Sequence, residues 1–315
     1  MIQYLVIILD DTSTSFCYYS NGKKARRLMP IEMLKAGILY AMKENLNVQF
    51  VYPDEPLPKE YDEIIDSVDS IKIKPSKNVD DADIIVFNGI DEARSFMSFA
   101  TNATYVLRLK KQMLFDNAES IVEMAEKSLR LNIVLTDVET FTDYDFSAYK
   151  NFLSRCSVKL ENLYVAGKSP QLNILTDRMM LEGMNNCGAG DTVITLAPDG
   201  KFYACPAFYF SADGYAVGNL QEGLDIKNPQ LYKLHHAPLC RICDAYQCKR
   251  CVWLNSKTTL EVNTPSHEQC VVSHLERNAS RELQTSIRKH GVFLPDIAEI
   301  KEISYLDPFD VREKW

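Results

Sequence analysis

Seven of the nine cysteines in this chain lie between residues 187 and 270, in less than a third of its 315 residues. The tightest group, from residue 240 to 251, reads C-R-I-C-D-A-Y-Q-C-K-R-C. A packed core uses cysteine as a small apolar residue and has no reason to repeat C-x-x-C. A metal, by contrast, needs several thiolates that converge on one point from short turns. The spacing therefore predicts metal ligation by this run, which comprises Cys187, Cys205, Cys240, Cys243, Cys248, Cys251 and Cys270.

The charge and the apolar stretches exclude some classes of partner. The chain carries 35 Lys and Arg against 43 Asp and Glu, a formal net charge of -8, whereas a nucleic-acid-binding surface normally needs a basic face. No stretch approaches the about 20 apolar residues that cross a bilayer, and the start M-I-Q-Y-L-V-I-I-L-D-D lacks the parts of a signal peptide. We expect a cytoplasmic protein with reduced cysteines and without a nucleic-acid or membrane partner.

Up to about residue 180, short apolar runs alternate with helical patterns, which is typical of βα units and a parallel sheet. Strands buried on both faces read as continuous Val, Ile and Leu runs, as I-I-V-F does here. The expected strands are residues 4–9, 48–52, 70–73, 84–87, 105–109, 133–136 and 172–175. Six or so such units can close into a barrel or form an open sheet, and periodicity does not decide between them.

The segments between these runs predict helices. The helix that follows Pro30 carries Ile31, Leu34, Ile38 and Met42 on one face, and proline suits the first helical turn. Further helices are expected over residues 60–68, 114–129 and 144–163.

After Asp177 the sequence becomes richer in glycine and asparagine, and we place a domain boundary near residue 180. Residues 192–205 predict a β-hairpin that turns at Pro198-Asp199-Gly200 and brings Cys205 beside Cys187. A helix and a polar tail that ends at Trp315 follow from about residue 275, with no chemistry expected in the tail.

The cysteine spacing alone leaves the identity of the metal open. A zinc ion would be held in a closed tetrahedral site by Cys240, Cys243, Cys248 and Cys251. That arrangement leaves the other three cysteines of the run without a role. Under this alternative the chain is a zinc-stabilised interaction module.

Several residues besides the cysteines stand in a characteristic order. Gly188 and Gly190 in C-G-A-G, the turn D-G-K-F-Y-A-C-P and the segment Gly218-Asn219-Leu220 precede the C-x-x-C group. In this order the region resembles the SPASM domain, a C-terminal extension of many radical S-adenosylmethionine enzymes that modify ribosomally made peptides. The last cysteine group is slightly more closely spaced than is commonest in that family. The resemblance implies an iron–sulfur domain over residues 181–280, followed by a C-terminal helix and tail over residues 281–315.

The resemblance implies two auxiliary [4Fe-4S] clusters with interleaved ligands. One cluster would be held by Cys240, Cys243, Cys248 and Cys270, and the other by Cys187, Cys205 and Cys251. The second set is one ligand short. The fourth position could be filled by Cys156 or a non-cysteine group, or could leave an iron open to solvent or substrate. On its expected helix, Cys156 is better explained as core packing.

The first 180 residues resemble a radical S-adenosylmethionine barrel, in which C-x3-C-x2-C follows the first strand. Here Asp10, Thr14 and Cys17 stand at the three positions, and residues 53–56 read P-D-E-P where the family has G-G-E-P. A carboxylate, a hydroxyl and one thiol are poor substitutes for three thiolates, so the resemblance is to a degenerate barrel that is not expected to cleave S-adenosylmethionine. The alternative is an ordinary polar loop in which Cys17 is incidental.

Over both domains the chain resembles the CXXX repeat peptide maturases. The expected fold is α/β, a degenerate radical-SAM-like partial (β/α)6 barrel over residues 1–180 followed by the cysteine-rich SPASM domain. The expected function is that of an iron–sulfur partner, for electron transfer or peptide binding, in a hetero-oligomer with a complete radical S-adenosylmethionine enzyme. A cysteine-rich precursor peptide is the second expected partner. The alternative is an active maturase whose open-site cluster itself binds substrate or S-adenosylmethionine.

No catalytic residue is predicted from the sequence. His235, His236 and His267 flank the cysteine groups and are expected to be exposed rather than ligands. Lys249 and Arg250 lie between two expected ligands, where their charge either eases the burial of an anionic cluster or is simply solvated.

Overall fold

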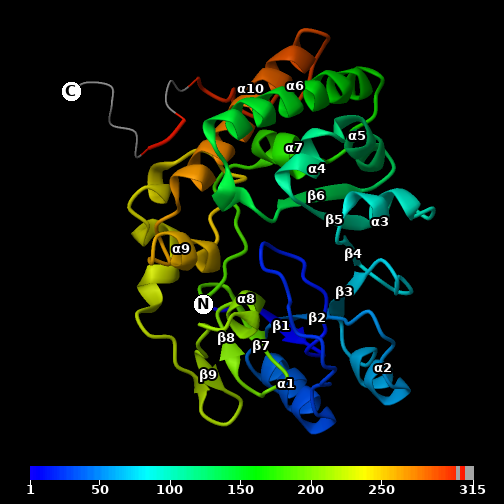
Figure 1. Ribbon diagram of the computed structural model, residues 1–315, viewed down its shortest axis with the longest axis vertical. Helices are drawn as coiled ribbons and strands as arrows, with labels where there is room; N and C mark the ends of the chain where they lie inside the picture. The colour runs from blue at the N-terminus through cyan, green and yellow to red at the C-terminus, as the bar shows by residue number, and fades with distance from the viewer. Residues whose placement is uncertain (303–305, 309–315) are drawn as a thin grey trace. The chain divides into compact units, whose positions relative to one another are not determined.

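The computed structural model describes residues 1–302 and 306–308 (Figure 1). The end of the expected polar tail, up to Trp315, lies outside the described residues. The chain forms two compact units, each assembled from two separate segments. The first unit contains Met1–Asn88 and Cys187–Ala237, and the second contains Gly89–Asn186 and the described residues from Pro238 onward. The domain boundaries expected near residues 180 and 280 stay predictions.

The first unit is built on strands that neighbour one another in the order β4-β3-β2-β1-β7-β8. Their bounds are β1 Tyr4–Ile8, β2 Asn47–Val51, β3 Ser70–Pro75, β4 Ile84–Phe87, β7 Val193–Leu196 and β8 Phe202–Tyr203. All neighbouring strands are parallel except β7 and β8. In the register of the central strand, Ile7 lies opposite Phe50 of β2 and Leu196 of β7. The expected parallel α/β arrangement is confirmed.

Helices α1 (Ile31–Lys43) and α2 (Lys59–Ile65) pack with alternate residues of these strands into one hydrophobic core (Figure 1). The approach of α1 is close, because a Cβ added at Gly37 would lie 2.4 Å from Leu196 Cδ2. Leu34 and Ile38 are buried as expected. The expectation for Met42 was wrong: it is 66% exposed, and Ala41 occupies the buried position at that turn.

The expected hairpin over residues 192–205 is confirmed as the antiparallel pair β7 and β8. Gly200 at its turn has a φ of +78°, a conformation that favours glycine. The rest of this unit's second segment contains α8 Pro206–Phe210, β9 Gly218–Asn219, β10 Gly223–Leu224, η2 Pro229–Tyr232 and η3 Leu234–His236.

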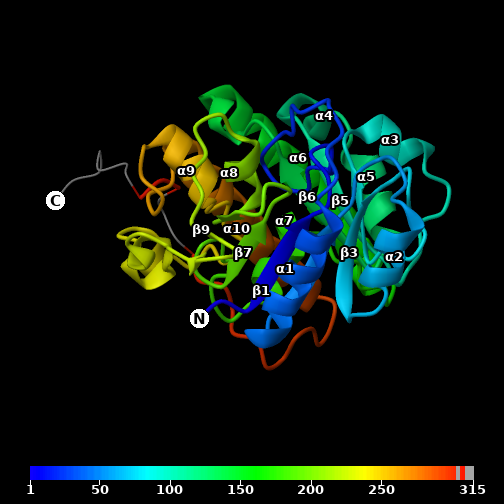
Figure 2. The same ribbon diagram turned by 90° about the horizontal axis from the view of Figure 1, so that it is seen from below.

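The second unit contains one parallel strand pair, β5 (Thr104–Leu109) and β6 (Arg130–Leu135), and most of the helices. The helices are α3 Ile90–Ser95, α4 Lys111–Phe115, α5 Ala118–Glu126, η1 Val138–Thr140, α6 Asp143–Val165, α7 Asn173–Met180, η4 Cys240–Ile242, α9 Val252–Thr258 and α10 His267–Arg288. The long helices α6 and α10 pack along each other, and α10 also contacts α7 (Figures 1 and 2).

Two expected elements differ from the structure. The strand expected at residues 172–175 is the start of α7. Leu172 makes one parallel bridge to Leu131, and the Asn173 side chain then takes the place of a further strand residue, donating to Ile133 O at 3.0 Å and accepting from Ile133 N at 2.8 Å. The helix expected at 114–129 is broken into α4 and α5, because the Asn117 side chain donates to Met113 O at 2.6 Å.

No helix in the described part of the chain is long and apolar enough to cross a membrane.

Candidate functional site

The densest cysteine group lies in the second unit, on a loop that leads from η4 to α9. Cys240 begins η4, Cys251 immediately precedes α9, and Cys270 lies in the first turn of α10. Helix α10 begins with a capping box in which Ser266 N donates to Gln269 Oε1 at 2.9 Å. Gln269 Nε2 also donates to Lys249 O at 2.9 Å. The helix start and the cysteine loop are therefore fixed to each other.

Four thiols of this group, those of Cys240, Cys243, Cys248 and Cys270, interact electrostatically with one another. Burial raises the pKa of Cys240 to about 12 and that of Cys243 to about 11, and it also raises the pKa of Cys248 and Cys270. Without a metal these thiols are protonated at neutral pH. Metal binding must therefore release their protons.

Hydrogen-bond donors are directed at the sulfurs of this group. Cys243 Sγ lies 3.3 Å from His274 Nε2 and accepts from Ala245 N at 3.4 Å. The Arg250 side chain hydrogen-bonds to Cys240, and its guanidinium lowers the thiol pKa against the larger effect of burial. Donors around a sulfur stabilise the thiolate rather than the thiol, so this environment suits a metal-bound cysteine.

The loop between Cys243 and Cys248 is clamped by two arginines. Asp244 accepts from Arg277 Nε at 3.0 Å and from Arg277 Nη2 at 2.8 Å, and it lies 3.3 Å from Arg178 Nη2. Arg178 Nε also donates to the Asp244 carbonyl oxygen at 2.5 Å. Burial opposes ionisation of Asp244, but the arginines outweigh it and lower its pKa. The bidentate contact fixes both the position and the orientation of this loop.

A second buried network holds the next part of the loop. Lys249 Nζ lies 2.9 Å from Glu276 Oε2, and Tyr149 Oη donates to Glu276 Oε1 at 2.5 Å. The side chains of Lys249 and Glu276 are 4% and 0% exposed. The Lys249 ammonium is thus paired within the protein, which excludes the alternative, left open by the sequence, that it is simply solvated.

These four thiols fit an iron–sulfur cluster by the chemistry of the donor set. They are soft ligands, buried at Cys240 and Cys270 and half-buried at Cys243 and Cys248, and the nearby carboxylates of Asp244 and Glu276 are paired with cations. Among the described residues, no three His, Cys, Asp or Glu side chains are placed to hold a single metal ion.

The three cysteines of the other expected ligand set do not all lie in the same unit. Cys187 is exposed and Cys205 half-buried in the first unit, whereas Cys251 is buried in the second. Their grouping around a second cluster stays a prediction. Cys156 is fully buried on α6 with its Sγ 3.9 Å from Ala118 O, a core position, and burial raises its pKa to about 12.

The turn that carries Cys187 depends on its glycines. Gly188 and Gly190 have φ values of +63° and +76°. The Gly188 carbonyl oxygen accepts from Thr192 N at 2.8 Å, and a Cβ on Gly190 would lie 2.2 Å from the Tyr232 ring. The sequence C-G-A-G is therefore explained by the backbone of a tight turn.

The loop after β1, where Asp10, Thr14 and Cys17 stand, is held by ion pairs and hydrogen bonds. Asp10 is fully buried and accepts from Thr12 N at 2.7 Å. Thr14 N donates to Tyr52 O at 2.9 Å, and Cys17 is half-buried. Only one of these three side chains is a thiol, so the loop does not fit a cluster that needs three.

Arg26 links this loop to the segment P-D-E-P. Its Nε lies 3.5 Å from Asp10 Oδ2, its Nη1 lies 2.5 Å from Glu55 Oε2, and its Nη2 donates to Pro56 O at 2.8 Å. The two loops that carry the motif positions are therefore joined by a guanidinium.

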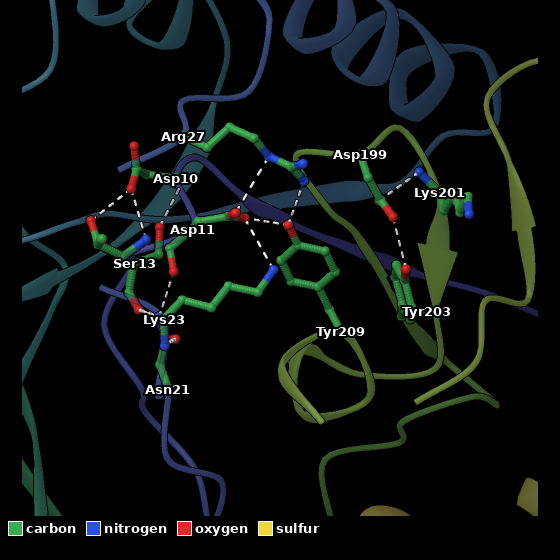
Figure 3. Close-up of polar contacts among 11 residues, drawn as sticks. Asp10, Asp11, Ser13, Asn21, Lys23, Arg27, Asp199, Lys201, Tyr203 and Tyr209 are labelled. Carbon is green, nitrogen blue, oxygen red and sulfur yellow. Dashed lines mark hydrogen bonds and ion pairs between the residues drawn. The ribbon is translucent and has the colours of Figure 1, made fainter. Parts of the chain in front are cut away.

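A neighbouring network surrounds Asp11 (Figure 3). Lys23 Nζ and Arg27 Nε each lie 3.3 Å from its carboxylate, and Tyr209 Oη donates a short hydrogen bond to it. Arg27 Nη2 donates to Tyr209 Oη at 2.9 Å, and Lys23 Nζ lies 3.6 Å from the centre of the Tyr209 ring. Burial, together with Asp11, raises the pKa of Tyr209. The network joins the loop to α8 and pairs the Asp11 carboxylate with two cations.

Sequence reasoning missed the residues around the sulfurs. His235 and His236 are exposed as expected, and His267 pairs with Asp307. The histidine at a thiol is instead His274. The signal was present in the helical spacing, since residues 270, 274 and 277 recur at i, i+4 and i+7 on one face of α10.

Comparison with solved structures supports the α/β fold. The chain is similar to hexahistidine-tagged anSMEcpe with bound AdoMet, with a TM-score of 0.63 and 12% identity over 93% of this chain and 97% of that one. It is also similar to native anSMEcpe with bound AdoMet and Cp18Cys peptide (TM-score 0.61, 12% identity, 91% and 99% of the two chains). A third structure, with AdoMet and Kp18Cys peptide, gives a TM-score of 0.58 at 13% identity over 91% and 99%.

No family model and no curated protein matches the sequence. The fold and the thiol group together define an α/β protein with a thiol-rich, partly buried site in its second unit.

Proposed function

We propose that this chain is an iron–sulfur protein of peptide maturation, which serves as the electron-transfer or peptide-binding partner of a complete radical S-adenosylmethionine enzyme. One contrast carries the proposal. Four thiols, two of them buried and two half-buried, form a group in the second unit with donors at their sulfurs, whereas the loop after β1 is held by ion pairs around Asp10 and Asp11. The similarity to anSMEcpe, which has been solved with AdoMet and peptides bound, supports a role in peptide chemistry.

In this proposal Cys240, Cys243, Cys248 and Cys270 hold one [4Fe-4S] cluster, and Cys187, Cys205 and Cys251 contribute to a second. A bound cluster supplies one-electron transfer. The residues of the chain hold the cysteine loop in place, through Asp244 and its arginines and through Lys249 and Glu276. A cysteine-rich precursor peptide is the proposed substrate of the assembly.

The test is anaerobic reconstitution with iron and sulfide, followed by metal analysis and electron paramagnetic resonance. Two clusters give about eight iron atoms per chain, and Cys248→Ala should lose about half of them. Cys156→Ala is the matched control and should keep all of its iron, because Cys156 lies in the core of α6. Zinc alone, or four or fewer iron atoms in the wild type, contradicts the two-cluster proposal.

The partner role is tested by activity. The reduced, reconstituted protein should form neither methionine nor 5′-deoxyadenosine from S-adenosylmethionine, while modification of the precursor peptide by the complete enzyme should require this chain. Cleavage of S-adenosylmethionine by this chain alone would instead identify it as an active maturase.

A further inference from the structure

His274 is buried against a proposed cluster ligand. It lies on α10, four residues after Cys270, and is 2% exposed. Its Nε2 atom lies 3.3 Å from Cys243 Sγ. A buried histidine that meets a sulfur at this distance makes a hydrogen bond whose direction depends on which atom carries the proton.

The chemistry of a ligand sulfur fixes that direction. A cysteine bound to iron has lost its proton, so its sulfur can only accept. The contact then requires the proton on His274 Nε2, and the imidazole donates to the cluster ligand. Ala245 N donates to the same sulfur at 3.4 Å. Hydrogen bonds to the sulfurs are one of the main factors that set the reduction potential of a cluster, because they stabilise the extra electron of the reduced form.

Arg250 is a second donor of this kind, and its neighbour Lys249 is not. Arg250 is 5% exposed, and its side chain hydrogen-bonds to Cys240. Lys249 is also buried, but its ammonium lies 2.9 Å from Glu276 Oε2. Of the two cations between Cys248 and Cys251, one is therefore neutralised by a carboxylate and the other is directed at a ligand sulfur.

We propose that His274 and Arg250 are positioning residues that donate hydrogen bonds to the ligand sulfurs of Cys243 and Cys240 and thereby raise the reduction potential of the cluster held there. The inference rests on the proposed function, in which these thiols hold a [4Fe-4S] cluster. In this inference the two side chains set the reduction potential at which the cluster transfers electrons, whereas the cysteines bind its iron.

The experiment is an anaerobic redox titration of reconstituted protein, followed by electron paramagnetic resonance, in a background with Cys187→Ala and Cys205→Ala so that one cluster remains. His274→Leu and Arg250→Met should each shift the midpoint to more negative potential. We expect the ratio of reduced to oxidised cluster at a fixed potential to fall about tenfold, which for a one-electron couple corresponds to about 59 mV. His274→Gln, which retains an N–H donor, should lie closer to the unsubstituted background.

Arg281→Gln is the matched control, because Arg281 is a cation on the same helix whose ion pair is with Glu302 at 3.7 Å. Its midpoint should not move. An equal shift in Arg281→Gln would attribute the effect to net charge and overturn the inference. Unchanged midpoints in His274→Leu and Arg250→Met would overturn it as well.

Failure of the proposed function has a different signature, since the unsubstituted background would then show no iron–sulfur signal at all. If His274→Leu folds but does not load iron, the comparison of Arg250→Met with Arg281→Gln still decides the question, because Arg250 donates to a ligand sulfur whereas Arg281 pairs with Glu302.

Discussion

Lys249 and Arg250 are neighbours in the sequence, yet their charges meet different partners. The Lys249 ammonium pairs with Glu276, which also accepts from Tyr149, and all three side chains are buried. Nothing in the local sequence distinguishes the two cations, because Glu276 follows 27 residues later on another element. The packing of the cysteine loop against α6 and α10 decides which of the two cations pairs with Glu276 and which one hydrogen-bonds to a ligand sulfur.

Removal of Lys249 should be strongly destabilising. Lys249→Met leaves the Glu276 carboxyl buried without its cation, and breaking one half of a buried pair costs about 3–5 kcal/mol. Chemical denaturation of the metal-free protein measures this loss in the free energy of unfolding. The double variant Lys249→Met, Glu276→Leu should recover a large part of it, since no unpaired charge remains. A single variant within about 1 kcal/mol of wild type would contradict the role of the pair.

The turn after Cys187 offers a second test on one residue. Gly190→Ala requires a side chain at a φ of +76° and places a Cβ 2.2 Å from the Tyr232 ring. We expect a loss of about 2 kcal/mol or more in the free energy of unfolding. Gly22→Ala is the control, because nothing lies within 4 Å of its added Cβ and its φ is not positive. Equal stability of the two variants would show that the turn tolerates the change.

Among the elements, the strands of the first unit were predicted well because buried parallel strands have a plain apolar signature. The segment at 172–175 has the same apolar signature, and it was wrongly predicted to be a strand. The Asn173 side-chain amide makes the hydrogen bonds to Ile133 that a strand residue would make, and apolar periodicity does not reveal such a contact. The start of α10 was placed too late at residue 275. The S-x-x-Q spacing of Ser266 and Gln269, which begins the helix, is visible in the sequence as a capping box.

Helix α6 carries a pH-dependent cap at its start. Asp145 Oδ2 lies 2.8 Å from Lys111 Nζ and accepts from Thr142 N at 2.8 Å. Burial opposes its ionisation, but Lys111 and Thr142 outweigh burial, so the pKa of Asp145 lies below its ordinary value. A carboxyl group whose pKa is lowered by folding stabilises the protein above its unfolded pKa of about 3.9, and the effect disappears as the pH falls through the folded pKa.

Asp145→Asn should therefore lower the free energy of unfolding by about 1 kcal/mol at neutral pH. The difference from wild type should vanish as the pH falls through the folded pKa of Asp145, which lies below its ordinary value. Denaturation curves of both proteins over this pH range measure it. A difference that stays constant down to the acid limit would show that the carboxylate charge does not contribute.

At the scale of the whole molecule, the arrangement of the chain could not be read from the sequence. The change of composition near residue 180 is real, but each compact unit draws on both sides of it. Periodicity reports which residues are buried and not which distant segments pack together. For the same reason the five cysteines from 240 to 270 could be assigned to one region, whereas the donors around them come from helix packing that spacing does not encode.

Removal of metal should leave most of the fold intact. In the first unit the loop after β1 is held in place without metal by the ion pairs of Arg26 and by the Asp11 network. Backbone hydrogen bonds, such as the one from Asp11 N to Arg27 O at 3.1 Å, hold it as well. In the second unit the cysteine loop is clamped through Asp244 and Lys249. Small zinc domains behave differently, because their folding free energy comes from the metal. Chelated protein should keep its far-ultraviolet circular dichroism and the slow hydrogen exchange of Asp11 and Met29, whose amides are bonded in this loop. A cooperative loss of the helical signal on chelation would contradict this expectation, because it would show that the fold depends on metal bound to the thiols.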